Sequence, residues 1–236
     1  MTQAWPPMQI EPLAEDAWLL RLGGTIDIDV NARVHAAAAR LRSGLADVEC
    51  VPAYASLLLR FDPMRWLDND GDFSGQRLRG AIDAALQQAG ASETAPRELI
   101  IPVCYGGEAG EDLHDVAAHT QLSPEEIIAR HTAPTYRVAM LGFAPGFPYL
   151  LGLDPALAMP RRSSPRTSVP AGSVAIGGQQ TGIYPQALPG GWQLIGRTPL
   201  RLFDATAGAP SLLLPGDRVR FRAIDGHEYR RFAAAT

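Results

Sequence analysis

Between residues 142 and 199 the chain reads GFAPGFPYL (142–150), PRRSSPR (160–166), VPAGSVAIGG (169–178), TGIYP (181–185) and PGGWQLIGRTP (189–199). Most of these phrases set a short apolar run beside glycine and proline, the residues that make turns. Closely spaced short strands with Gly/Pro turns between them are typical of a small barrel, closed or partly open. This stretch therefore predicts a β-barrel.

The sequence on either side extends the β pattern. We predict the clearest strands at 136–142, 168–176, 192–197 and 218–223. In the last of these, Arg218, Arg220 and Arg222 alternate with apolar residues, the period of a half-buried strand. The predicted barrel domain covers residues 134–236.

The N-terminal part alternates strand and helix patterns. Strands are predicted at 10–22, 53–61 and 98–105, and helices at 30–45, capped by Asp29 or Asn31, and at 78–89, ended by Gly90. The order β-α-β-α-β, with room for one more short strand, favours an α+β sandwich of ferredoxin-like type over residues 1–105.

Residues 106–133 are predicted to be a helical connector, with short helices at 110–121 and 123–131. The second helix has a strong start signal, because Ser123 can cap it, Pro124 suits its first position and Glu126 can close a capping box.

The composition excludes several kinds of function. The chain has 236 residues and a formal net charge of −4, which favours neither nucleic acid nor an anionic membrane as a partner. All its basic residues are arginine, so no P-loop lysine, Schiff-base lysine or biotinyl lysine is possible. An anion must be bound by arginine, backbone N–H groups or a helix N-terminus.

The expected location is the cytoplasm. The N-terminal sequence has neither the basic region nor the apolar region of a signal peptide, and no apolar run approaches the ~20 residues that span a bilayer. Cys50 and Cys104 are too few for a disulfide framework. No metal site is predicted, since His114 and His119 lack the spacing of a metal-binding helix.

The glycine- and proline-rich stretch is also the candidate site. Glycine lets backbone N–H groups approach a ligand, and proline reduces the entropy lost when a loop becomes ordered. Aromatic side chains can form walls, and arginines can clamp a carboxylate or phosphate. The predicted substrate-binding residues are Phe147, Arg161, Arg166, Ser173, Gly177, Gly178, Thr181, Tyr184, Trp192, Arg197 and Thr198. The alternative is that these phrases are tight barrel turns whose aromatic residues fill a core.

These phrases, with YGGEAGEDL (105–113) and PGDRVRF (215–221), resemble one bacterial family. It is the family of the B subunit of ATP-dependent 5-oxoprolinase, also called allophanate hydrolase subunit 1 or the Kip inhibitor, and the resemblance covers nearly the whole chain. It implies an N-terminal α+β domain and a cyclophilin-like barrel. It also implies that the chain acts with A and C subunits to convert 5-oxo-L-proline to L-glutamate with ATP hydrolysis.

The residue types suggest roles within such a complex. Gly177, Gly178 and Thr181 would donate hydrogen bonds to a developing oxyanion, and the arginines would hold a carboxylate or phosphate. The candidates for proton transfer are Glu108, Glu111, Asp112 and His131. ATP would be used by the complex, and this chain would bind no cofactor unaided. Two alternatives remain: an inhibitor of a sensor histidine kinase, and a carboxyltransferase-type subunit of a urea-metabolising complex.

Overall fold

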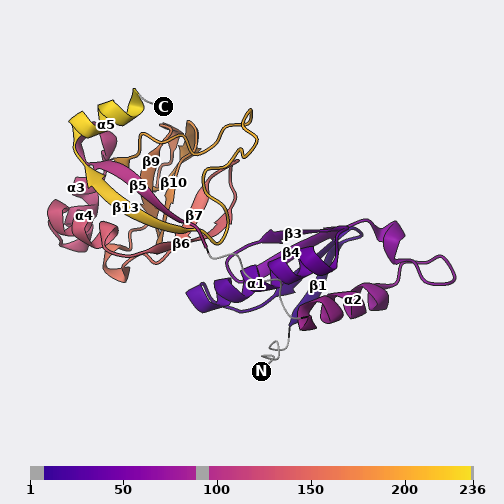
Figure 1. The fold of residues 1–236 in the computed structure, drawn as a ribbon. Coiled ribbons are helices and arrows are strands. Elements are labelled where there is room, and N and C mark those ends of the chain that lie inside the picture. Colours follow the sequence, from indigo (N-terminus) through magenta and orange to yellow (C-terminus); the bar gives the residue numbers. More distant parts are fainter. Residues whose placement is uncertain (1–7, 89–95, 235–236) are drawn as a thin grey trace. The chain divides into compact units, whose positions relative to one another are not determined.

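The chain forms two compact units, Met1–Ala95 and Pro96–Thr236, in a computed structural model that describes residues 8–88 and 96–234 (Figure 1). Each unit has its own hydrophobic core. Among the described residues, no helix has the length and apolar character needed to cross a membrane.

The N-terminal unit is a four-stranded antiparallel sheet in the order β1-β2-β4-β3. Its elements are β1 (Gln9–Ala14), β2 (Ala17–Arg21), α1 (Ile28–Gly44), β3 (Val48–Pro52), β4 (Ser56–Phe61) and α2 (Gly75–Gln87). Apolar residues of α1 and α2, such as Leu41 and Ile82, share one buried cluster with Leu20, Leu57 and Leu59 of the sheet. Both helices therefore cover the same face of the sheet.

Several predictions for this unit need correction. The predicted strand 10–22 is a hairpin of two strands, because the polar pair Glu15-Asp16 makes a turn in its middle. β3 was not predicted, and α1 is capped by Asp27, whose carboxylate accepts hydrogen bonds from the N–H groups of Asp29 and Val30. The predicted stop at Gly90 lies outside the described residues.

The ferredoxin-like topology is not confirmed. A ferredoxin-like domain follows the order β-α-β-β-α-β. This unit instead runs β-β-α-β-β-α, and its neighbouring strands β2 and β4 are antiparallel. The more general prediction, that this unit has an α+β fold, is confirmed.

The C-terminal unit is a closed barrel of seven strands in the order β10-β7-β6-β13-β5-β12-β9 (Figure 1). The strands are β5 (Glu98–Tyr105), β6 (Tyr136–Leu141), β7 (Pro148–Leu151), β9 (Ser173–Gly177), β10 (Gln180–Ile183), β12 (Gln193–Arg197) and β13 (Arg218–Ile224). The unit also contains α3 (Leu113–Thr120), α4 (Pro124–Thr132), α5 (Gly226–Ala233) and a two-stranded ribbon of β8 (Arg166–Val169) and β11 (Leu188–Gly190). The predicted strand 168–176 is thus interrupted, because Pro170 and the left-handed Gly172 turn the chain between β8 and β9.

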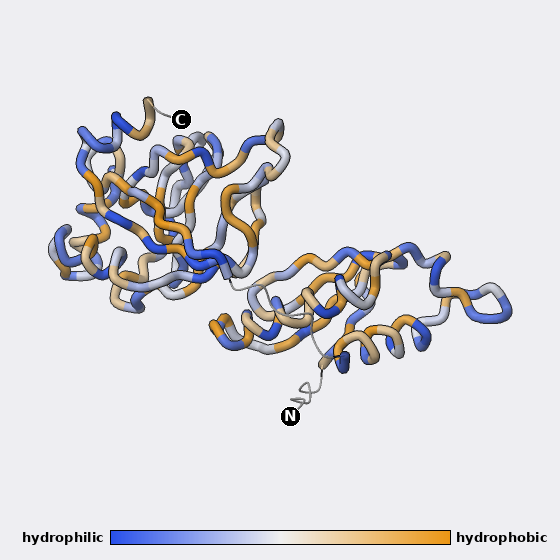
Figure 2. Tube along the Cα trace, in the orientation of Figure 1, coloured by the Kyte–Doolittle hydropathy of each residue, from blue (hydrophilic) through white to orange (hydrophobic). Residues whose placement is uncertain are grey.

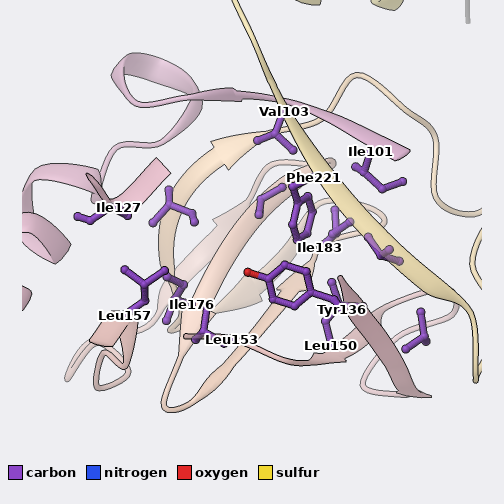
Figure 3. Packing of buried hydrophobic residues seen from close by; sticks show 14 of the residues in the cluster. Ile101, Val103, Ile127, Tyr136, Leu150, Leu153, Leu157, Ile176, Ile183 and Phe221 are labelled. Carbon is purple, nitrogen blue, oxygen red and sulfur yellow. The ribbon is translucent and has the colours of Figure 1, made fainter. Parts of the chain in front are cut away.

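The barrel encloses an apolar core. Tyr136, Leu150 and Ile176 point into it from three strands, and the Phe221 ring packs edge-on against Tyr136 (Figure 3). Hydrophobic residues occur along the barrel strands and alternate there with hydrophilic ones (Figure 2). The predicted barrel is confirmed as a closed one, whereas its cyclophilin-like character stays a prediction.

The boundaries of the domains differ from those predicted. The N-terminal domain was expected to end at residue 105, but the units divide between Ala95 and Pro96, and β5 belongs to the barrel. β5 pairs in parallel with β13 along its length, from Glu98 with Arg218 to Cys104 with Ile224. α3 and α4 belong to the same unit, and their residues Val116 and Ile127 are buried in the barrel core. The predicted connector 106–133 is therefore part of the barrel unit.

Candidate functional site

The loop between β6 and β7 is held rigidly by its own backbone. The N–H of Gly142 donates to the carbonyl of Phe147, the N–H of Ala144 to that of Gly142, and the N–H of Phe147 to that of Ala144. Gly146 has a φ of +77°, and a Cβ there would come within 2.7 Å of the Phe203 side chain. Glycine is required at this position both by the left-handed backbone and by the closeness of the ring.

Phe143 is the exceptional residue of this loop. Its φ is +67°, in the left-handed region that costs an L-residue roughly 1–2 kcal/mol. Its side chain is nevertheless 61% exposed, although the ring meets Phe147 edge-on at 5.5 Å between centroids. Strain at a bulky non-glycine residue is concentrated at functional sites, so this loop is the first candidate for a binding surface.

A groove of about 480 Å³ opens beside Phe143. It is wide open to solvent, unlike the enclosed pockets that bury most of a small ligand. The groove is lined by Leu141, Gly142, Phe143, Ala144, Pro145, Gly146, Phe203 and Ser211. Among the described residues, the N–H of Phe143, an exposed residue that lines the groove, has no hydrogen-bond partner.

Behind the groove lies an aromatic cluster, which comprises Phe147, Tyr149, Tyr184 and Trp192. Phe147 is edge-on to Tyr184 at 5.2 Å and to Trp192 at 5.7 Å, and both of these rings are buried. The cluster packs on Ala175 and Leu194, whose strand neighbours Ile176 and Ile195 belong to the barrel core, so the rings cover the outside of the barrel wall. The side chains of Phe147, Tyr184 and Trp192, which were predicted to form the walls of a ligand site, thus fill a small core outside the barrel. This is the role that the alternative interpretation gave them.

One charged group touches this cluster from the surface. The guanidinium of Arg161, an exposed residue, lies over the Trp192 ring at 5.7 Å from its centroid, within the range of a cation–π interaction. Aromatic contacts therefore run without a break from Phe143 through Phe147 and Trp192 to Arg161.

Asp112 forms an internal ion-pair cluster. Its buried carboxylate accepts hydrogen bonds from Arg162 at 3.1 Å, from Arg166 at 2.7 and 2.9 Å, and from the N–H of Leu194 at 2.7 Å. Asp112, chiefly through its hydrogen bond, raises the pKa of Arg166, which also pairs with Glu111 at 3.3 Å. The cluster fastens the segments around residues 112, 166 and 194 together, so neither the predicted acid Asp112 nor the predicted clamp Arg166 is free to meet a substrate.

His131 lies inside the barrel unit with no exposure to solvent. Because the Thr181 hydroxyl donates to the carbonyl of Ala175, it accepts the His131 Nε2–H at 3.1 Å, and Nδ1 then accepts the Tyr105 O–H at 2.7 Å. Burial lowers the pKa of His131 to about 3, so the ring is neutral at pH 7. This arrangement stabilises the core and keeps His131 and Thr181 from a solute, contrary to the roles predicted for them.

None of the other predicted residues lines the groove. Ser173 and Thr198 are buried, and the Thr198 side chain accepts from the N–H of Leu200. Gly177 lies under the Trp192 ring, where a Cβ would be 2.6 Å from the indole, while Gly178 has open space around it. The Arg197 guanidinium donates to the Glu108 carbonyl, at 3.4 Å, and Glu108 itself is exposed. Among the described residues no group of His, Cys, Asp and Glu could hold a metal ion.

A family model described as carboxyltransferase domain, subdomain C and D, matches residues 8–213. The B subunit of 5-oxoprolinase from Bacillus subtilis is 45% identical over 95% of this chain and 96% of its own length. The protein of the same name from Haemophilus influenzae is 44% identical over 94% of this chain and 100% of its own. This chain belongs to the 5-oxoprolinase B-subunit family.

Solved structures share the fold of this chain. TTHA0988 has a TM-score of 0.76 at 41% identity over 89% of this chain, which spans only 40% of the TTHA0988 chain. The urea carboxylase of Kluyveromyces lactis has a TM-score of 0.69 at 19% identity, over 95% of this chain and 22% of its own, and this likeness shows the fold alone.

The groove of this chain was not predicted from its sequence. Phe203 and Ser211 were not among the predicted site residues, and Phe143 entered only as part of GFAPGFPYL. The available signal was a phenylalanine among glycine and proline turn residues, where an aromatic side chain can be left at the surface. Its left-handed backbone could not be anticipated, because phenylalanine rarely adopts it.

Proposed function

We propose that this chain is the B-type subunit of an ATP-dependent 5-oxoprolinase, acting with A- and C-type subunits to open the lactam of 5-oxo-L-proline to L-glutamate in the cytoplasm. The observation that carries the proposal is the near-complete match, at 44–45% identity, to two proteins named as B subunits of 5-oxoprolinase. The more general conclusion, that this chain is a component of a hydrolase complex, rests on the same relatives.

The geometry supports a composite active site, completed by other subunits. The lactam is an unstrained amide, so the route we propose is phosphorylation of its oxygen by ATP followed by attack of water. The groups predicted for proton transfer and anion binding in this chain are mostly engaged internally, at Asp112, Arg166 and His131. We therefore assign ATP binding and proton transfer chiefly to the partners.

This chain would contribute binding rather than acid–base chemistry. Arg161 is the exposed predicted arginine beside the aromatic cluster, with its guanidinium over Trp192. In the proposed complex it pairs with the carboxylate of oxoproline or with the phosphate, and an arginine is suited to either. Arg197 and Glu108 remain weaker candidates at the barrel surface.

The test is reconstitution with A- and C-subunit homologues from one genome, measuring glutamate formation and oxoproline-dependent phosphate release. We expect activity only when all three proteins are present. Arg161→Ala should raise the KM for oxoproline at least about tenfold, whereas Arg60→Ala, which removes an exposed pair with Asp16 in the other unit, should leave it unchanged. An active mixture lacking this chain would refute the proposal.

The carboxyltransferase alternative has narrower support. A putative urea carboxylase of Emericella nidulans is 27% identical over 135 residues, which are 54% of this chain and 11% of that protein. Such chemistry would need a biotinyl group from another chain, since this one has no lysine. Activity of the reconstituted complex without biotin separates the two proposals, and an assay of kinase autophosphorylation tests the inhibitor alternative.

A further inference from the structure

Phe143 combines two features that do not stabilise this chain by themselves. Its backbone is in the left-handed region, with φ at +67°, and its side chain is 61% exposed. A residue that is both strained and exposed is better explained by a partner that buries it than by the fold of the isolated chain.

The loop presents this side chain in one fixed position. Its three internal backbone hydrogen bonds, and the packing of Gly146 against Phe203, leave the loop little freedom to collapse. The ring of Phe143 rests edge-on against Phe147, which is itself held by Tyr184 and Trp192. A pre-ordered aromatic side chain loses little entropy on binding, as is typical of an interface anchor.

We propose that Phe143 and the adjoining groove are the docking site for a second protein, the C-type subunit of the complex. The matching family model covers subdomains C and D of a carboxyltransferase domain, and this chain spans only 40% of TTHA0988. In that relative the counterpart of this chain is therefore joined to further protein. We infer that a separate protein, corresponding to that further part, covers the groove here.

The size and chemistry of the surface suit a protein partner. A phenylalanine and a groove of about 480 Å³ can form the apolar centre of an interface, around which a polar rim completes the roughly 800 Å² that a stable contact buries on each side. The N–H group of the exposed Phe143, which has no partner among the described residues, can donate to a carbonyl or carboxylate oxygen of the docked protein. The choice of the C-type subunit as the partner rests on the proposed function.

The decisive variant is Phe143→Gly, which removes the ring and also suits the left-handed backbone. We expect the thermal midpoint of the isolated chain to stay the same or rise, while the Kd for the purified C-subunit homologue, measured by calorimetry, weakens about 30-fold or more. Ile100→Ala and Met64→Ala, which truncate other exposed apolar side chains, are matched controls and should change the Kd less than about threefold.

Each outcome decides the point. A Kd for Phe143→Gly equal to that of the native chain, a control as damaging as Phe143→Gly, or no binding by the native chain would overturn the proposal. So would a dimer of this chain alone that Phe143→Gly dissociates, or saturable binding of 5-oxoproline to the isolated chain that Phe143→Gly abolishes. Docking that depends on Phe143, in a complex that does not hydrolyse oxoproline, would support this proposal while refuting the proposed function.

Discussion

At the scale of single residues, the Asp112 cluster holds a buried carboxylate between two arginines of the barrel unit. Asp112→Asn keeps the shape but removes the charge that pairs with Arg162 and Arg166. We expect a loss of about 2–3 kcal/mol in the free energy of unfolding, less than the roughly 3–5 kcal/mol of a fully buried pair, because both guanidiniums keep some contact with water. Urea denaturation measures it.

The neighbouring Glu111 provides the control. Its carboxylate also reaches Arg166, at 3.3 Å, but it is exposed, so Glu111→Gln should cost less than about 1 kcal/mol. Equal effects of Glu111→Gln and Asp112→Asn would contradict the view that burial makes the Asp112 cluster strong.

His131 should make the stability of the chain depend on pH. Its pKa is about 3 in the folded chain and 6.5 ordinarily, so unfolding takes up a proton between these values. Its contribution is therefore complete above pH 6.5 and is lost as the pH falls toward 3. Between pH 7 and pH 5 the native chain should lose about 2 kcal/mol more unfolding free energy than His131→Gln.

This comparison isolates one residue, because the carboxylates titrate alike in both proteins. The groups that face the ring, Tyr105 and Tyr136, have raised pKa values through burial and stay neutral throughout this range. Parallel stability curves for the two proteins, measured by urea denaturation from pH 5 to pH 7, would contradict the assignment.

At the scale of elements, the local start signal of α4 was read correctly, whereas the distant pairing of β5 was not. The capping box of Ser123 and Glu126 is present at the start of α4, since both of its hydrogen bonds depend on residues three apart. The strand 98–105 was also predicted, but its partner β13 lies more than a hundred residues further along. No local pattern encodes that pairing, so the strand was assigned to the wrong unit.

The last residue of β9, Gly177, and the residue that follows it, Gly178, form a matched pair of glycines. Gly177→Ala would set a Cβ 2.6 Å from the Trp192 indole, so we expect a loss of about 1–3 kcal/mol and a changed Trp192 fluorescence. Gly178→Ala meets no neighbouring atom, but its φ of +66° should cost roughly 1–2 kcal/mol without disturbing the ring. Subtracting spectra recorded with Trp192→Phe isolates the signal, and an equal spectral change in both variants would contradict the proposed contact.

At the scale of the whole molecule, the residue types predicted the barrel but did not predict that its polar groups bind one another instead of a substrate. Asp112, Arg166 and His131 have the chemistry of an active site, and only the fold shows that they are partners of buried or internal groups. The groove escaped prediction because it joins the 142–147 loop to Phe203 and Ser211, some sixty residues later.

Two separate cores imply that the units can be destabilised separately. Leu57 is buried in the core of the N-terminal unit and Leu150 in that of the barrel. Truncating either to alanine should cost about 2–5 kcal/mol in its own unit, through lost burial and the cavity left behind. Hydrogen exchange followed by mass spectrometry should show Leu57→Ala exposing amides of residues 8–88 while residues 96–234 keep their protection, and Leu150→Ala doing the reverse. A uniform loss of protection across both units in either variant would show instead that the chain unfolds as one cooperative body.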